Sequence, residues 1–116
     1  MHELAIMKNI IQICTEKMEQ AGKNRITRIE LQVGALRNIE EPWMQQYFGY
    51  ISPGTAAEGA TVKIERIPLI FQCGDCGHKY TPNPRDPRTF PCAKCGSANY
   101  DMVSGRELII HRMEIE

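Results

Sequence analysis

The sequence predicts an α+β fold with two helices, three strands and an inserted cysteine-rich segment. Apolar residues recur at helical spacing near the N-terminus, and three later stretches have the composition or alternation of strands. Residues 69–102 differ from the rest, because they hold four of the five cysteines and few aliphatic side chains. This segment lies between the last two expected strands, so we expect it to be an excursion from the main domain.

Two stretches are expected to be helical. Between Glu3 and about Ala21, one face carries an apolar series at steps of three and four: Leu4, Met7, Ile11, Cys14 and Met18. Gly22 is a plausible end for this helix, because glycine readily adopts the left-handed backbone of a helix C-terminus. Pro42 fits the first turn of a second helix that runs to about Tyr50 or Ile51, and the acidic residues before it suit the helix dipole.

Three stretches are expected to be strands. Residues 26–33 alternate, with Thr27, Ile29, Leu31 and Val33 on one face, which is typical of a half-buried strand. Residues 61–67 alternate again, with Val62 and Ile64 directed inward, and Pro68 ends the stretch. Residues 108–115 form a last strand that is rich in apolar and β-branched residues.

The four clustered cysteines form two C-x2-C-G units, Cys73/Cys76 and Cys92/Cys95, with 15 residues between them. This spacing is typical of a zinc ribbon, because each short turn presents two sulfur atoms to one ion. Four thiolates close a tetrahedral shell, so the expected Zn(II) is structural. A redox C-x-x-C motif is the alternative, but such a motif needs one pair in a βαβ setting.

The segment has few aliphatic residues, so we expect it to lack an apolar core and to depend on the metal for folding. We therefore expect a zinc-ribbon domain at residues 69–102 and a discontinuous α/β domain at residues 1–68 and 103–116. Cys14 lies on the apolar face of the first helix and is expected to be a buried hydrophobe. His78 and His111 are expected to be ordinary histidines, although His78 is near enough in sequence to compete for the metal.

The N-terminus offers a second group of donors at Met1, His2 and Glu3. The α-amine of Met1, the backbone nitrogen of His2 and its imidazole can close fused chelate rings on one ion. Such a nitrogen-rich set suits square-planar Ni(II) or Cu(II), and Glu3 can supply a further donor. The alternative is that His2 is incidental and that Glu3 simply favours the first turn of the helix.

Composition argues against several classes of protein. The formal net charge is zero, which is mild evidence against a protein that binds nucleic acid through its phosphates. No segment has the roughly 20 apolar residues of a membrane span and the start lacks the features of a signal peptide, so we expect a cytoplasmic protein. We find no catalytic arrangement and no phosphate-binding loop, and we expect no enzyme activity.

A zinc-ribbon adaptor for nucleic acid or protein is the main functional alternative. The cysteine-rich segment carries positive charge at Lys79, Arg85, Arg88 and Lys94. Tyr80 and Phe90 could stack on bases. We favour the interpretation that these residues form a solvated loop whose two aromatic rings cover the cysteine turns.

Several motifs together resemble the HypA/HybF family. They are the start Met1-His2-Glu3-Leu4, the strand end Leu31-Gln32-Val33-Gly34, the step Ala57-Glu58-Gly59, and the paired C-x2-C units ahead of a last strand. The resemblance covers nearly the whole chain. It implies two helices packed on a three-stranded sheet with an inserted zinc domain.

The resemblance also implies a function, a nickel metallochaperone for nickel–iron hydrogenase. The family's nickel motif falls on Met1, His2 and Glu3, where Ni(II) is transient cargo, and its zinc ligands fall on the four cysteines. The implied partners are a HypB-type GTPase, the hydrogenase large subunit and, for some members, urease maturation proteins. Nucleic acid and membranes are not among them, and homodimer formation is left open.

Overall fold

A computed structural model describes residues 3–116, and its internal contacts divide the chain into two compact units. The first unit comprises the described residues up to Gln32 together with Ile39–Glu65 and Ile109–Glu116, and the second comprises Val33–Asn38 and Arg66–Leu108. The elements follow the order α1 (Glu3–Gln20), β1 (Ile26–Gly34), α2 (Glu41–Ile51), β2 (Thr61–Ile67), β3 (Ile70–Cys73), β4 (Lys79–Tyr80), a 3-10 turn (Pro87–Thr89), β5 (Tyr100–Ser104) and β6 (Leu108–Ile115).

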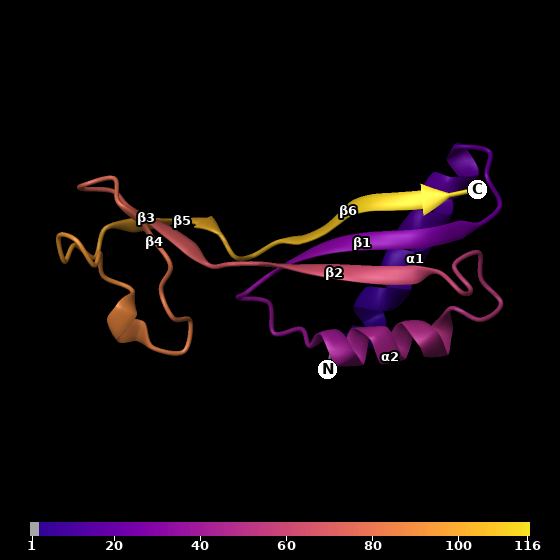
Figure 1. The fold of residues 1–116 in the computed structure, drawn as a ribbon, viewed down its shortest axis with the longest axis horizontal. Coiled ribbons are helices and arrows are strands. Elements are labelled where there is room, and N and C mark those ends of the chain that lie inside the picture. The colour runs from indigo at the N-terminus through magenta and orange to yellow at the C-terminus, as the bar shows by residue number, and fades with distance from the viewer. Residues whose placement is uncertain (1–2) are drawn as a thin grey trace. The chain divides into compact units, whose positions relative to one another are not determined.

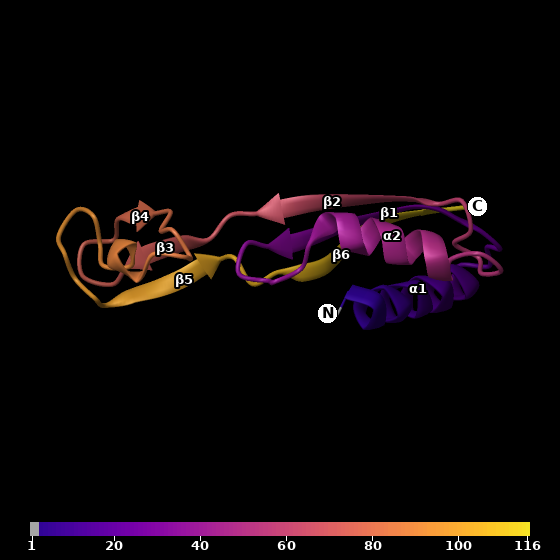
Figure 2. The same cartoon turned by 90° about the horizontal axis from the view of Figure 1, so that it is seen from below.

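The first unit is built on a three-stranded sheet with the strand order β2-β1-β6. Helices α1 and α2 contact each other and lie on the same face of this sheet (Figures 1 and 2). The predicted α+β class, with two helices on three strands, is confirmed. Among residues 3–116, no helix has the length and apolar character needed to cross a membrane.

Helix α1 contributes most of its predicted apolar face to the core, except that Leu4 is only half-buried and Ile10 is buried as well. Its buried apolar side chains follow helical spacing: Met7, Ile10, Ile11, Cys14 and Met18. The helix ends as the sequence indicates, since Gly22 has a φ of +73° and Lys23 N–H donates to the carbonyl of Met18 at 3.1 Å. This left-handed turn satisfies a carbonyl that would otherwise lack a partner at the end of the helix.

Strand β1 separates an apolar face from a polar one. Ile29, Leu31 and Val33 are buried, whereas Arg28 and Glu30 point away from the core and form an ion pair at 2.8 Å. The alternation fails at the start of the strand, where Ile26 is fully buried and Thr27 is only half-buried. Thr27 Oγ1 instead donates to the carbonyl of Glu114 at 3.2 Å, so its hydroxyl supports the pairing with β6.

The second unit contains an antiparallel sheet with the order β4-β3-β5 and a small aromatic core. The rings of Phe71 and Tyr100 stack at 4.5 Å, and those of Tyr80 and Phe90 meet Phe71 edge-on at 5.9 and 5.4 Å. The expectation that residues 69–102 lack an apolar core is therefore wrong in part. The aliphatic count misses these rings, each of which buries a large apolar area.

Gly34 occupies a point where two segments of the second unit come very close. Its N–H donates to the carbonyl of Glu107 at 2.7 Å, and the N–H of Leu36 donates to the carbonyl of Gly105 at 2.9 Å. A Cβ atom at position 34 would lie 2.1 Å from the carbonyl oxygen of Gly105. Because the obstructing atoms are backbone, no change of rotamer would relieve this contact.

We predict that Gly34→Ala lowers the free energy of unfolding by about 1–3 kcal/mol, the usual range for an overpacked site. Gly49→Ala is the matched control, since a Cβ atom there meets nothing within 4 Å and the glycine lies inside α2. That substitution should be stabilising by up to about 1 kcal/mol, because alanine favours helix. Urea unfolding of both variants measures the effect, and equal midpoints would contradict the close approach.

Candidate metal centre

The first cysteine pair lies on the turn that joins β3 to β4. Within this turn the N–H of Gly77 donates to the carbonyl of Cys73 at 3.0 Å, and the N–H of Cys73 donates to the carbonyl of His78 at 2.9 Å. The N–H of Asp75 points to Cys73 Sγ at 3.4 Å. Gly77 has a φ of +76°, a conformation that glycine adopts without strain. The local sequence therefore fixes the form of the turn and the direction of Cys73 Sγ.

The second pair repeats this geometry on the turn before β5. The N–H of Gly96 donates to the carbonyl of Cys92 at 2.8 Å, and the N–H of Cys92 donates to the carbonyl of Ser97 at 2.9 Å. Lys94 N–H points to Cys92 Sγ at 3.4 Å, as Asp75 N–H does to Cys73. Each C-x2-C-G unit is thus an independent copy of one turn, which we call a knuckle.

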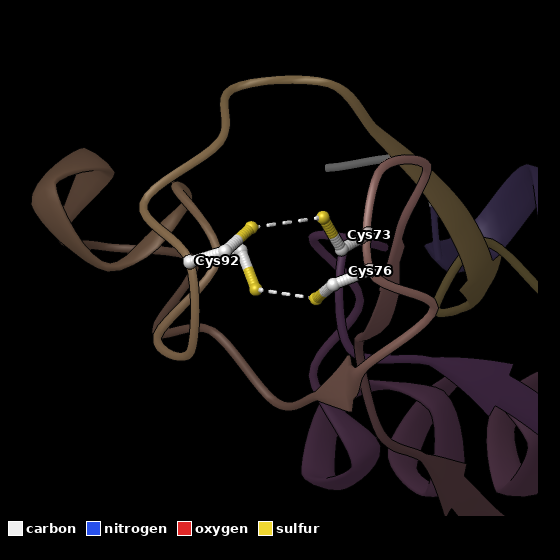
Figure 3. A group of neighbouring side chains, drawn as sticks. Cys73, Cys76 and Cys92 are labelled. Carbon is white, nitrogen blue, oxygen red and sulfur yellow. Dashed lines mark hydrogen bonds between the residues drawn. The ribbon is translucent and has the colours of Figure 1, made fainter.

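The two knuckles bring all four sulfur atoms to within 4.8 Å of one another. Sγ of Cys73 lies 3.5 Å from that of Cys95, and Sγ of Cys76 lies 3.6 Å from that of Cys92. Figure 3 shows the sulfur atoms directed toward one common space between the turns. These separations exclude disulfides, which need about 2.05 Å, and approach the roughly 3.8 Å between ligands of a tetrahedral ion with bonds of about 2.3 Å. The residues present fit a closed tetrathiolate site.

The electrostatics of the cluster favour a bound cation. Hydrogen bonds from backbone N–H groups, that of Cys76 first, lower the pKa of Cys73 to about 7. For Cys95, the N–H of Ser97 lowers the pKa, but the neighbouring thiols, Cys73 foremost, raise it to about 12. One thiolate therefore opposes the ionisation of the next, and a divalent cation is what allows four to coexist.

Two aromatic residues and one basic residue near the knuckles make contacts within the second unit. The hydroxyl of Tyr80 donates to the carbonyl of Phe90, and both rings belong to the aromatic core. Arg88 is paired with Asp86 at 2.9 Å. Both rings thus pack within the second unit, which agrees with the expectation that they serve the cysteine turns.

The side chains of the two described histidines and of the fifth cysteine do not belong to the sulfur cluster. The ring of His78 stacks on Tyr80 at 5.9 Å and does not belong to the group of metal-ligating atoms. His111 is exposed on β6. Cys14 is buried as expected, and burial raises the pKa of its thiol to about 11, so it stays a neutral apolar group.

The expected nickel motif is only partly within the described residues. Met1 and His2 lie outside them. Glu3 is the first residue of α1, is 4% exposed, and accepts a hydrogen bond from the N–H of Glu40 at 3.4 Å through Oε2. Sequence reasoning did not indicate this contact, because Glu40 is far from Glu3 along the chain.

Comparisons with a family model and with curated relatives give the same family, and a solved structure gives the same fold. A family model described as hydrogenase/urease nickel incorporation metallochaperone, HypA, matches residues 1–115. The hydrogenase maturation factors HypA of Lawsonia intracellularis and Dehalococcoides mccartyi are 34% and 32% identical, covering 100% of this chain and 100% and 95% of their own. A solution structure of the Ni metallochaperone HypA from Helicobacter pylori is 22% identical and matches the fold with a TM-score of 0.68, over 99% of this chain and 97% of its own. The resemblance expected from the motifs is confirmed, and the chain belongs to the HypA family of metallochaperones for nickel incorporation.

Proposed function

We propose that this chain carries Ni(II) at Met1, His2 and Glu3 and delivers it during hydrogenase maturation, while Zn(II) stays in the four-cysteine site. The single observation that carries the proposal is the family match, which runs from residue 1 to residue 115 and so includes the N-terminal motif. As a family of metallochaperones, HypA proteins carry a metal and are not enzymes. The expectation of no enzyme activity agrees with this membership.

The closed sulfur site supports a separate place for the nickel. Within residues 3–116, the four cysteines are the only group of three or more metal-ligating side chains that could hold an ion. A tetrathiolate leaves no open position and suits a structural Zn(II). Exchangeable nickel therefore needs other donors, and backbone nitrogen atoms combined with an imidazole are donors that Ni(II) prefers.

Glu3 ties the proposed nickel site to the fold. Its carboxylate is held by Glu40 N–H immediately before α2, and its backbone begins α1. The proposed ligands Met1 and His2 directly precede this anchored residue. A partner that receives the metal is thus proposed to approach near the start of α1.

The proposed partners follow from the family's role. They are a HypB-type GTPase and the large subunit of nickel–iron hydrogenase. Urease maturation proteins are a further proposed recipient, and a homodimer is a further proposed assembly. We place residues 69–102 as a zinc-ribbon domain and residues 1–68 with 103–116 as the nickel-binding α/β domain.

We predict that His2→Ala lowers the affinity for Ni(II) by at least about tenfold, because it removes one nitrogen donor from a chelate that needs all of them. A short extension ahead of Met1 should have a similar effect, since it removes the free amine while leaving His2 in place. Isothermal titration with Ni(II) measures both. His111→Ala is the matched control, because it removes an exposed histidine from β6. Unchanged affinity in the extended protein would overturn the proposed ligands.

We also predict that Cys73→Ser and Cys95→Ser release Zn(II) and unfold the region around the knuckles, because metal binding supplies much of its folding energy. The first unit should keep its helices, since its core contains none of the four ligands. Zinc content by atomic spectroscopy and proton–nitrogen NMR spectra report the two effects. Cys14→Ala is the control and should retain its zinc. Full zinc occupancy in Cys73→Ser would be incompatible with four equivalent thiolate ligands.

A further inference from the structure

The two knuckles are each well defined internally, but something must hold them together. The backbone bonds within each turn do not join the two knuckles, which are connected where β3 pairs with β5 and Cys73 lies opposite Tyr100. A bound cation can bridge the turns, but forming all four metal–sulfur bonds then costs the conformational entropy of both turns. Contacts between the knuckles therefore determine how easily the shell opens.

Asp75 makes such contacts. It lies between the first two cysteines, and its carboxylate accepts a hydrogen bond from the hydroxyl of Ser97 and another from Asn99 Nδ2 at 3.4 Å. Ser97 directly follows the second knuckle, and Asn99 lies two residues further along. The N–H of Asn99 donates to Ser97 Oγ at 3.0 Å, and the N–H of Gly74 donates to the carbonyl of Asn99 at 2.7 Å. The carboxylate thus joins the first knuckle to the chain leaving the second.

The same residue also contacts the metal-ligating atoms through its backbone. The N–H of Asp75 points to Cys73 Sγ at 3.4 Å. Anchoring the side chain of Asp75 restrains this amide, and so restrains the sulfur that it contacts. Groups that orient metal ligands in this way affect metal affinity even though they never touch the ion.

The second knuckle has no equivalent link. Lys94 occupies the position that corresponds to Asp75 and its N–H makes the matching contact to Cys92 Sγ. Its side chain, however, is exposed and takes part in no hydrogen bond or ion pair within the described chain. The local turns are alike, and the side chain at this position is what distinguishes them.

The charge of Asp75 does not explain its placement. Zn(II) with four thiolates carries a formal charge of about −2, so a further carboxylate nearby is repelled. A favourable contribution from Asp75 must therefore come from its hydrogen bonds to Ser97 and Asn99. The neutral amide of asparagine has the same shape and can exchange hydrogen bonds with both partners.

We propose that Asp75 is a positioning residue that clamps the two knuckles through Ser97 and Asn99 and thereby slows the release of the metal. This inference rests on the proposed Zn(II) site. It concerns the rate at which that site opens and is independent of where nickel binds.

The test is the rate at which a chelator removes Zn(II) from the full-length, zinc-loaded protein. Asp75→Ala should release the ion about tenfold faster than the wild type, at the lower end of the effect of losing a group that orients a ligand. Ser97→Ala should also speed release, but by less than Asp75→Ala, because it leaves the bond from Asn99 Nδ2 to the carboxylate. The double variant should be no faster than Asp75→Ala, because that single change already removes both bonds of the carboxylate. The visible spectrum of Co(II)-loaded protein should shift in each, since the sulfur geometry changes.

Two further variants separate this role from a general effect on folding. Lys94→Ala changes the corresponding position in the second knuckle and should release zinc at the wild-type rate. Asp75→Asn should restore most of the slow release. Equal rates in Asp75→Ala and the wild type, acceleration by Lys94→Ala, or failure of Asp75→Asn to restore slow release would overturn the clamp. If Asp75→Ala does not fold, Ser97→Ala carries the test. A wild-type protein that holds no zinc would instead refute the proposed metal site.

Discussion

The mutual repulsion of four crowded thiolates is the constraint on which the second unit depends. Their sulfur atoms lie within 4.8 Å of one another. The N–H of Cys76 and other backbone donors lower the pKa of Cys73 to about 7, whereas the neighbouring thiols raise that of Cys95 to about 12 against the N–H of Ser97. A divalent cation attracts each thiolate, and this attraction outweighs the repulsion between the thiolates. The four aromatic rings beside the knuckles pack against one another and bury apolar surface. The cation therefore decides whether the knuckles close, while the rings give the closed state a surface to pack against.

The first unit does not share this dependence. Its core is made of apolar side chains from α1, α2 and the sheet, as in an ordinary globular domain. A carrier benefits from such a division, because loss or exchange of one metal then need not disturb the support of the other. In the proposed function, the sheet and helices hold the start of α1 in place whether or not nickel is bound there.

Much of the fold follows from local patterns in the sequence. The steps of three and four in α1, the left-handed glycine at position 22 and the alternation of β2 are decided by neighbours along the chain, so the sequence predicts them well. The four cysteines were also predictable, because their spacing already imposes the turn. Contacts between distant segments were not: Asp75 meets Asn99, and Gly34 meets Gly105, only after the strands have paired. The aromatic core was missed for the same reason, since its four rings come from separate elements. The nickel motif is a different case, because its donors are too common to identify without a family.

The two proposed sites differ in how their ligands resist loss of the ion. In the sulfur site all donors come from the folded chain, and opening one knuckle requires breaking the links through Asp75 as well as metal–sulfur bonds. In the proposed nickel site the donors come from Met1, His2 and Glu3, three adjacent residues of which the last begins α1. Such donors can be displaced one at a time by a competing ligand, without unfolding any element. Retention of one metal and transfer of the other then follow from where the ligands are attached, even before the intrinsic preferences of the two ions are considered.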